Sequence, residues 1–111
     1  MRSSLPKLVV ENKSFQKNRR KAFEQSFEKA HTLFCAKDSK GKGVDPLVSG
    51  TTCTCLLFEG STIHIANVGD SRVILCRKGE DGGDQVMQLS SDHKPNRQDE
   101  RKRLTPVVPF F

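Results

Sequence analysis

Asp70 is the first residue of this chain whose type and position could support chemistry. It lies in the step Gly69-Asp70-Ser71-Arg72, between the apolar runs 63–68 and 73–76. A carboxylate at a strand end can bind Mg²⁺ or Mn²⁺, because these hard cations prefer oxygen ligands and use few carboxylates from any one segment. The alternative is a tight turn, in which the aspartate and serine side chains bond the local backbone. The residues alone favour the turn, and the metal interpretation of Asp70 stays open.

Other candidate groups give weaker signals. His93, in Asp92-His93-Lys94-Pro95, could act as a general acid, but a histidine between an aspartate and a proline is more often structural. Ser71 has no partner base that the sequence identifies, and it does not lie in a G-x-S-x-G motif. The sequence also lacks a G-x-x-x-x-G-K-[ST] phosphate-binding loop. We therefore assign no catalytic residue from these patterns.

The cysteines predict a reduced protein. Cys53 and Cys55 would point to the same face of one strand, where neighbours two apart are poorly placed to bridge each other. No C-x-x-C pair is present, so zinc is not expected. With Cys35 and Cys76, we expect largely buried, reduced thiols in an intracellular protein, either cytoplasmic or nuclear. No apolar run suggests a signal peptide or a membrane span.

Positive charge is concentrated in the first part of the chain. The whole sequence has a formal net charge of +6, and residues 1–43 carry 11 Lys or Arg against 4 Asp or Glu. Such a segment could bind nucleic acid or anionic lipid. The favoured alternative is the solvated face of a surface helix, because no nucleic-acid recognition motif accompanies the charge. We do not expect nucleic-acid or membrane binding.

A long amphipathic helix is expected over residues 14–37, with Ser14 as its cap. Its apolar side chains recur at the helical period and predict a face that packs on a sheet; they are Phe15, Phe23, Phe27, Ala30 and Phe34. Residues 1–13 form a polar lead whose Leu8-Val9-Val10 run is either a docking strand or a frayed end. A loop is expected over residues 38–46.

Strands dominate the rest of the chain. Apolar and β-branched runs predict strands at 51–58, 62–68, 73–77 and 86–89. Short turns favour antiparallel neighbours, and the step at 69–72 is expected to be one of the hairpins. Asn96 is expected to cap a charged helix over residues 97–104, which Pro106 stops. The pattern predicts an α+β fold.

Four segments in this order resemble one family, the metal-dependent protein serine/threonine phosphatases of type 2C, also called PPM. Ser49-Gly50-Thr51-Thr52 resembles its S-G-[ST]-[TA] strand start, and Ala66 to Leu75 resembles its A-N-x-G-D-S-R-x-x-L hairpin. Leu89 to Asn96 resembles its L-[ST]-x-D-H-K-P-x stretch, and Glu100 to Leu104 resembles its E-x-x-R-[IL] helix. Each segment alone is modest evidence for the family, but four segments in this order and at compatible spacing are highly specific for it. The resemblance covers about residues 14–104.

The resemblance implies a PPM-type β-sandwich of antiparallel strands flanked by helices. It also implies a binuclear Mg²⁺ or Mn²⁺ centre and hydrolysis of phosphoserine or phosphothreonine in a phosphoprotein substrate. In that scheme Asp70 resembles a ligand of an additional, weaker metal. Asn67 and Arg72 would support the hairpin, and Asp92 and His93 would form a turn, with no catalytic role.

The sequence also departs from the family pattern. The principal metal-ligand segments D-G-H-G-G, D-G-x-x-D and G-x-x-D-N are absent, and the apolar tail 105–111 interrupts the expected helix. We expect residues 14–104 to be an incomplete internal piece of a phosphatase domain, through a truncated gene model or a shortened isoform. Such a piece would have little or no activity and would expose apolar sheet faces. The alternative is a non-catalytic, pseudophosphatase-like interaction module.

Overall fold

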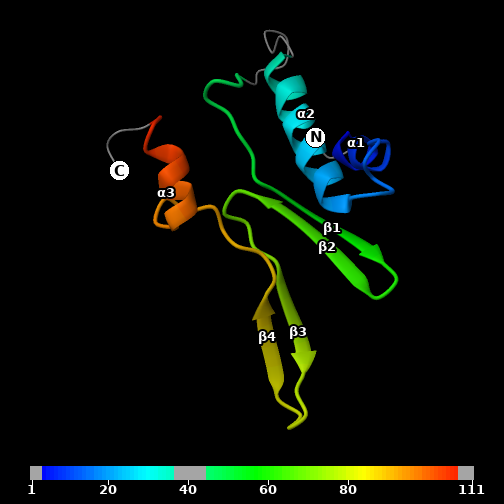
Figure 1. Ribbon diagram of the computed structural model, residues 1–111. Coiled ribbons are helices and arrows are strands. Elements are labelled where there is room, and N and C mark those ends of the chain that lie inside the picture. Colours follow the sequence, from blue (N-terminus) through cyan, green and yellow to red (C-terminus); the bar gives the residue numbers. More distant parts are fainter. Residues whose placement is uncertain (1–3, 37–44, 108–111) are drawn as a thin grey trace. The chain divides into compact units, whose positions relative to one another are not determined.

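The chain divides into two units, Met1–Gly50 and Thr51–Phe111, which are described separately. The computed structural model, drawn as a ribbon in Figure 1, describes residues 4–36 and 45–107. Most of the expected loop at 38–46, and the end of the tail at 108–111, lie outside these ranges. Within them, no helix has the length and apolar character that a membrane crossing requires.

The first unit contains two helices that pack against each other, α1 (Leu5–Val10) and α2 (Arg19–Ala36). In α1, Leu5 and Val9 are buried and lie one turn apart on the same face. Pro6 lies in the first turn, where its fixed backbone angle suits a helix and its missing N–H costs nothing. The expectation of a docking strand or frayed end at residues 8–10 was therefore wrong, because burial of this face stabilises a helix.

Helix α2 begins five residues later than the sequence predicts. The carbonyl oxygen of Ser14 accepts hydrogen bonds from the N–H groups of Lys17 and Asn18, at 3.0 and 2.7 Å, and closes a separate turn. The side-chain oxygen of Asn18 then accepts the N–H of Lys21 at 2.9 Å, which is the bond that an N-cap makes. Asn18 is thus the cap in place of Ser14, and Phe15 lies outside the helix.

The remaining apolar stripe of α2 is confirmed as its less exposed face. Phe23 and Ala30 are buried, and Phe27 and Phe34 are half-buried. Basic side chains occupy the solvated surface, where Arg20 pairs with Glu24 one turn away at 2.9 Å. The packing of this stripe on a sheet stays a prediction.

The second unit contains four strands and one helix: β1 (Cys53–Glu59), β2 (Thr62–Val68), β3 (Ile74–Lys78), β4 (Asp84–Gln88) and α3 (Gln98–Leu104). Strands β1 and β2 form one antiparallel two-stranded sheet, and β3 and β4 form another. Short turns at residues 60–61 and 79–83 join the paired strands. The α+β class is confirmed, with antiparallel strands in two small sheets and helices in both units, as in a partial phosphatase-type domain.

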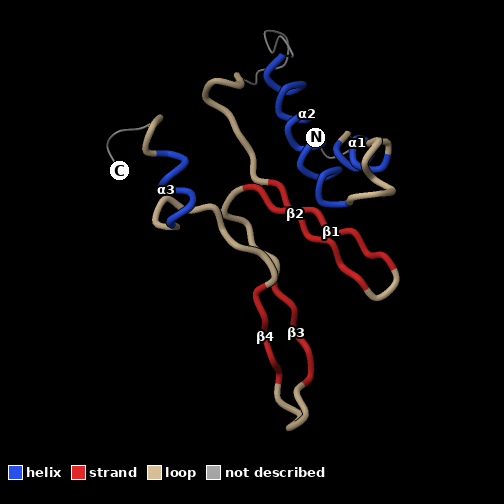
Figure 2. The backbone as a smooth tube through the Cα atoms, in the orientation of Figure 1, coloured by secondary structure: helices blue, strands red, loops and turns tan. Residues whose placement is uncertain are grey.

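The expected hairpin at residues 69–72 was wrong. Strand β2 pairs with β1, and β3 pairs with β4, so the two strands that flank Asp70 are not partners. Figure 2 draws the chain between β2 and β3 as a loop. The physical reason is that the backbone of Gly69 bonds to His93, far along the chain, instead of continuing a ladder.

Two smaller expectations also failed. Asn96 does not cap α3, whose N-cap is Arg97 and lacks a side-chain capping bond. The four cysteines are free, as expected, but they are not largely buried: Cys35 and Cys76 are exposed, while Cys53 and Cys55 are half-buried. Partial burial raises the pKa of the Cys55 thiol to about 11, with Cys53 adding to the shift. Thiol burial depends on tertiary cover, which residue type alone does not supply.

Both hairpins expose apolar side chains, as the sequence predicts for an incomplete sandwich. Phe58 on β1, Ile74 on β3 and Val86 on β4 have exposed fractions of 68%, 60% and 66%. A two-stranded hairpin has limited stability of its own and normally needs a packed face. Side-chain and backbone bonds between the loops must therefore supply much of the order in this unit.

Candidate functional site

Residues 69–73, which carry Asp70, are bonded to residues 89–93. The N–H of His93 donates to the carbonyl oxygen of Gly69 at 2.9 Å, and the N–H of Gly69 donates to Nδ1 of His93 at 3.4 Å. The N–H of Val73 donates to Oγ of Ser90 at 2.8 Å. We refer to residues 69–73 and 89–93, joined by these bonds, as the clamp.

An ion pair between Arg72 and Asp92 is the strongest contact of the clamp. Nε and Nη2 of Arg72 donate to the two carboxylate oxygens of Asp92 at 2.9 and 2.7 Å. This two-bond geometry fixes the relative orientation of the two side chains and also strengthens the ion pair. Lys94 lies 3.3 Å from the same carboxylate, whose side chain is only 8% exposed. The hydrogen bonds from Arg72, with a contribution from Lys94, lower the pKa of the Asp92 carboxyl to about 2.

The ends of β1 and β2 hold the other side of the turn. The amide nitrogen of Asn67 donates to the carbonyl oxygen of Gly69 at 3.2 Å, and the amide oxygen accepts the Thr54 hydroxyl at 2.5 Å. The hydroxyls of Thr52 and Ser71 bond at 2.7 Å. Asn67 thus supports the turn, as predicted, although the turn is not a hairpin. The Ser71 hydroxyl is engaged by this bond, and its exclusion as a nucleophile stays a prediction.

Gly69 permits the close approach of these strands. Its φ of +102° lies in a region that side-chain-bearing residues rarely adopt. An added Cβ would lie 2.4 Å from Cγ2 of Thr52, well inside contact distance. The position therefore requires glycine for two independent reasons.

Asp70 contrasts with every neighbour in the clamp. It is exposed, and among the described residues its carboxylate has no hydrogen-bond or ion-pair partner. A turn-forming aspartate would accept local backbone N–H groups. Asp70 is thus displayed to solvent by a fixed backbone, while the residues on both sides of it are bonded.

Helix α3 extends the network through Glu100 and Arg103 of the E-x-x-R-[IL] segment, and through Arg97, to which the sequence interpretation gave no role. Nη1 of Arg97 donates to the carbonyl oxygens of Ser91 and Asp92 at 3.1 and 3.0 Å. Glu100 is buried and receives two bonds from Arg103, which lower the pKa of its carboxyl. The Glu100 and Arg103 spacing, three apart on a helix, was a visible signal. Nothing local indicated that Arg97 would reach back to the clamp.

The described residues do not make a complete metal centre. Across residues 4–36 and 45–107, no three His, Cys, Asp or Glu side chains group as metal ligands. Asp70 could supply one oxygen ligand, since a single exposed carboxylate suits Mg²⁺ or Mn²⁺. His93 and Asp70 are not part of any such group, and Nδ1 of His93 accepts the N–H of Gly69.

Comparison with known proteins gives a consistent family signal. A family model described as "Protein phosphatase 2C" matches residues 1–107. "Probable protein phosphatase 2C 7" from Oryza sativa subsp. japonica is 34% identical over 96 residues, covering 86% of this chain. "Protein phosphatase 1F" from Homo sapiens is 39% identical over 89 residues, covering 80% of this chain. The chain spans only 23% and 18% of these two relatives. No solved structure matches it significantly.

Replacing Gly69 with alanine should destabilise the second unit. The positive φ alone costs about 1–3 kcal/mol for a residue with a side chain, and the overlap with Thr52 adds to this cost. The control is Gly82→Ala, since Gly82 has a φ of +78° but nothing within 4 Å of an added Cβ. Urea unfolding of both variants measures the difference. Equal losses for Gly69→Ala and Gly82→Ala would contradict the close packing against Thr52.

The ion pair of the clamp predicts a defined pH dependence. The pKa of Asp92 is lowered in the fold, so its charged form stabilises the fold above about pH 4, the ordinary range of an aspartate. This stability is lost as the pH falls from about 4 to about 2. The free-energy difference between wild type and Asp92→Asn should therefore shrink over that window in urea titrations.

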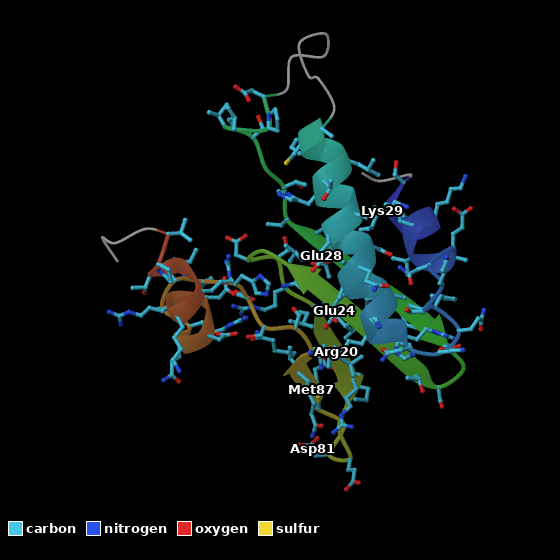
Figure 3. The ribbon with its side chains drawn as sticks, turned by 45° about the horizontal axis from the view of Figure 1, so that its top comes forward. Arg20, Glu24, Glu28, Lys29, Asp81 and Met87 are labelled. Carbon is cyan, nitrogen blue, oxygen red and sulfur yellow. The ribbon has the colours of Figure 1, made fainter. Side chains whose placement is uncertain are left out.

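Asp81→Asn is the matched control, because Asp81 lies at the end of the β3–β4 hairpin, away from the clamp (Figure 3). Parallel stability curves for wild type and Asp92→Asn between pH 4 and pH 2 would show that the ion pair contributes nothing to folding.

Proposed function

The chain belongs to the protein phosphatase 2C family, and on this premise we propose that it forms part of a domain that dephosphorylates proteins. The reaction is hydrolysis of phosphoserine or phosphothreonine, with Mg²⁺ or Mn²⁺ as the cofactor. The substrate is a phosphoprotein. Because the chain spans so little of its relatives, this activity belongs to a larger domain of which the chain is one segment.

The observation that carries the proposal is the state of Asp70. Its backbone is held on both sides by Gly69, Ser71 and Arg72, yet its carboxylate is exposed and has no partner among the described residues. A fixed, unpaired carboxylate is suited to a cation because little conformational entropy is lost on binding. Asp70 is thus proposed as one metal ligand of the domain.

The other ligands of a binuclear site must come from outside the described residues, since these bring no further carboxylates to Asp70. One carboxylate cannot hold two metal ions, so the isolated chain is expected to show little or no turnover.

An intracellular location is part of the proposal. Cys35, Cys53, Cys55 and Cys76 are all free thiols. Free thiols persist in the reducing environment of the cytoplasm or nucleus, whereas secreted domains of this size usually form disulfides.

A second candidate is a non-catalytic interaction module. The exposed apolar side chains of both hairpins, including Phe58 and Val86, favour it because such surfaces often contact another polypeptide. The two candidates differ in whether the segment supports turnover when the rest of a phosphatase domain is supplied.

A chimaera tests the proposed function. The segment of human protein phosphatase 1F that aligns with this chain is replaced by the chain itself, and hydrolysis of a phosphothreonine peptide is followed against Mn²⁺ concentration. We expect turnover, and we expect Asp70→Asn to lower kcat/KM at limiting Mn²⁺ by about tenfold or more, a typical cost for a group that tunes a metal site.

Asp81→Asn in the same chimaera should leave the Mn²⁺ dependence unchanged, because Asp81 lies on a distant turn of the second unit. A chimaera that folds but has no turnover would favour the interaction module. Equal Mn²⁺ dependence of wild type and Asp70→Asn would remove Asp70 from the metal site.

A further inference from the structure

Strand β1 places two thiols side by side. Cys53 and Cys55 are two residues apart, so they point to the same face of the strand, as expected. Their sulfur atoms lie 3.9 Å apart, and both residues are half-buried. Neither thiol takes part in a disulfide, so both are available for another partner.

The side chains around Cys53 and Cys55 add no further metal ligand, so this position offers two sulfur ligands. Ala66 and Val68 of β2 lie opposite the cysteines and contribute no donor atoms. The next side chain along that face, His64, bonds to Glu59 at 3.1 Å. No third His, Cys, Asp or Glu joins the pair within the ranges that the structure describes.

The sulfur separation suits a single bound metal ion. Two metal–sulfur bonds of about 2.3 Å can join sulfurs that lie up to roughly 4.6 Å apart, so one ion can contact both sulfurs at the 3.9 Å seen here. The nearly linear arrangement of a two-coordinate ion needs the sulfurs to move slightly apart, by rotation of the two side chains. The protein therefore holds the sulfurs near a chelating geometry before any ion is bound.

The number of ligands then selects the ion. Structural zinc sites almost always use four protein ligands, which this position does not provide. Soft thiolates also select Cu(I), an ion that is satisfied by two or three sulfurs. We propose that Cys53 and Cys55 bind one Cu(I) ion as a bis-thiolate. Each thiol releases one proton to solvent, two copper–sulfur bonds form, and the oxidation state of copper does not change.

The chain offers a matched comparison for this pair. On α2, Sγ of Cys35 lies 3.7 Å from Nε2 of His31, so a second soft pair exists on an exposed helix face. Cys76 on β3 is exposed and lies on another strand. Variants of Cys35 and Cys76 therefore distinguish metal binding at Cys53 and Cys55 from metal binding by any thiol of the chain.

The test is an anaerobic titration of the full chain with Cu(I) in competition with a chromophoric Cu(I) chelator. We expect one tightly bound ion per chain. Cys53→Ser and Cys55→Ser should each weaken binding by about 100-fold, the scale seen when metal-site groups are lost. Cys35→Ser and Cys76→Ser should keep the wild-type affinity. Circular dichroism checks that each variant folds, with Cys53→Ala and Cys55→Ala as second variants.

Three results would overturn the proposal. The first is an absence of competitive Cu(I) binding by the wild-type chain. The second is loss of the tight site in Cys35→Ser with retention in Cys53→Ser, which would move the ion to His31 and Cys35. The third is binding of Zn²⁺ as tightly as Cu(I) in a parallel titration, because two ligands do not suit zinc.

Discussion

The ion pair between Arg72 and Asp92 is the contact on which the arrangement of the second unit most depends. It joins the loop that leaves β2 to the loop that leaves β4, and it does so with two bonds to a carboxylate that is 8% exposed. Such a carboxylate is costly to leave unpaired, so the two loops are stabilised together. Because β2 and β3 are not paired, no strand ladder could do this in place of the ion pair.

The residues that carry the family resemblance act mainly as supports. Asn67, Gly69, Arg72, Asp92 and His93 all bond within or beside the clamp. The motif residues therefore fix the backbone of residues 69–73. The Asp70 carboxylate lies within this segment and is exposed to solvent. In the first unit, by contrast, order comes from the apolar faces of two helices that pack together.

Local patterns predicted the elements of the fold better than the links between them. Spacing of apolar residues identified α2 and all four strands, because period and turn chemistry are short-range properties. The same reasoning placed a hairpin at Gly69, since it could not see that His93, 24 positions later, takes the backbone bonds of that glycine. The start of α2 was misplaced because Ser14 and Asn18 are both good caps, and only the hydrogen bonds decide between them. For Asp70, the sequence left open whether it forms a turn or binds a metal. Its side chain makes no turn bond among the described residues, and metal binding is the proposal.

The central claim is that the clamp presents the Asp70 carboxylate to a divalent cation. Proton–nitrogen correlation spectra of the full chain, recorded with small additions of Mn²⁺, test this most directly, because the paramagnetic ion broadens nearby amide signals. We expect the signals of residues 69–71 to broaden first, and we expect Asp70→Asn to remove this selectivity. Equal broadening of these signals in wild type and Asp70→Asn would contradict it.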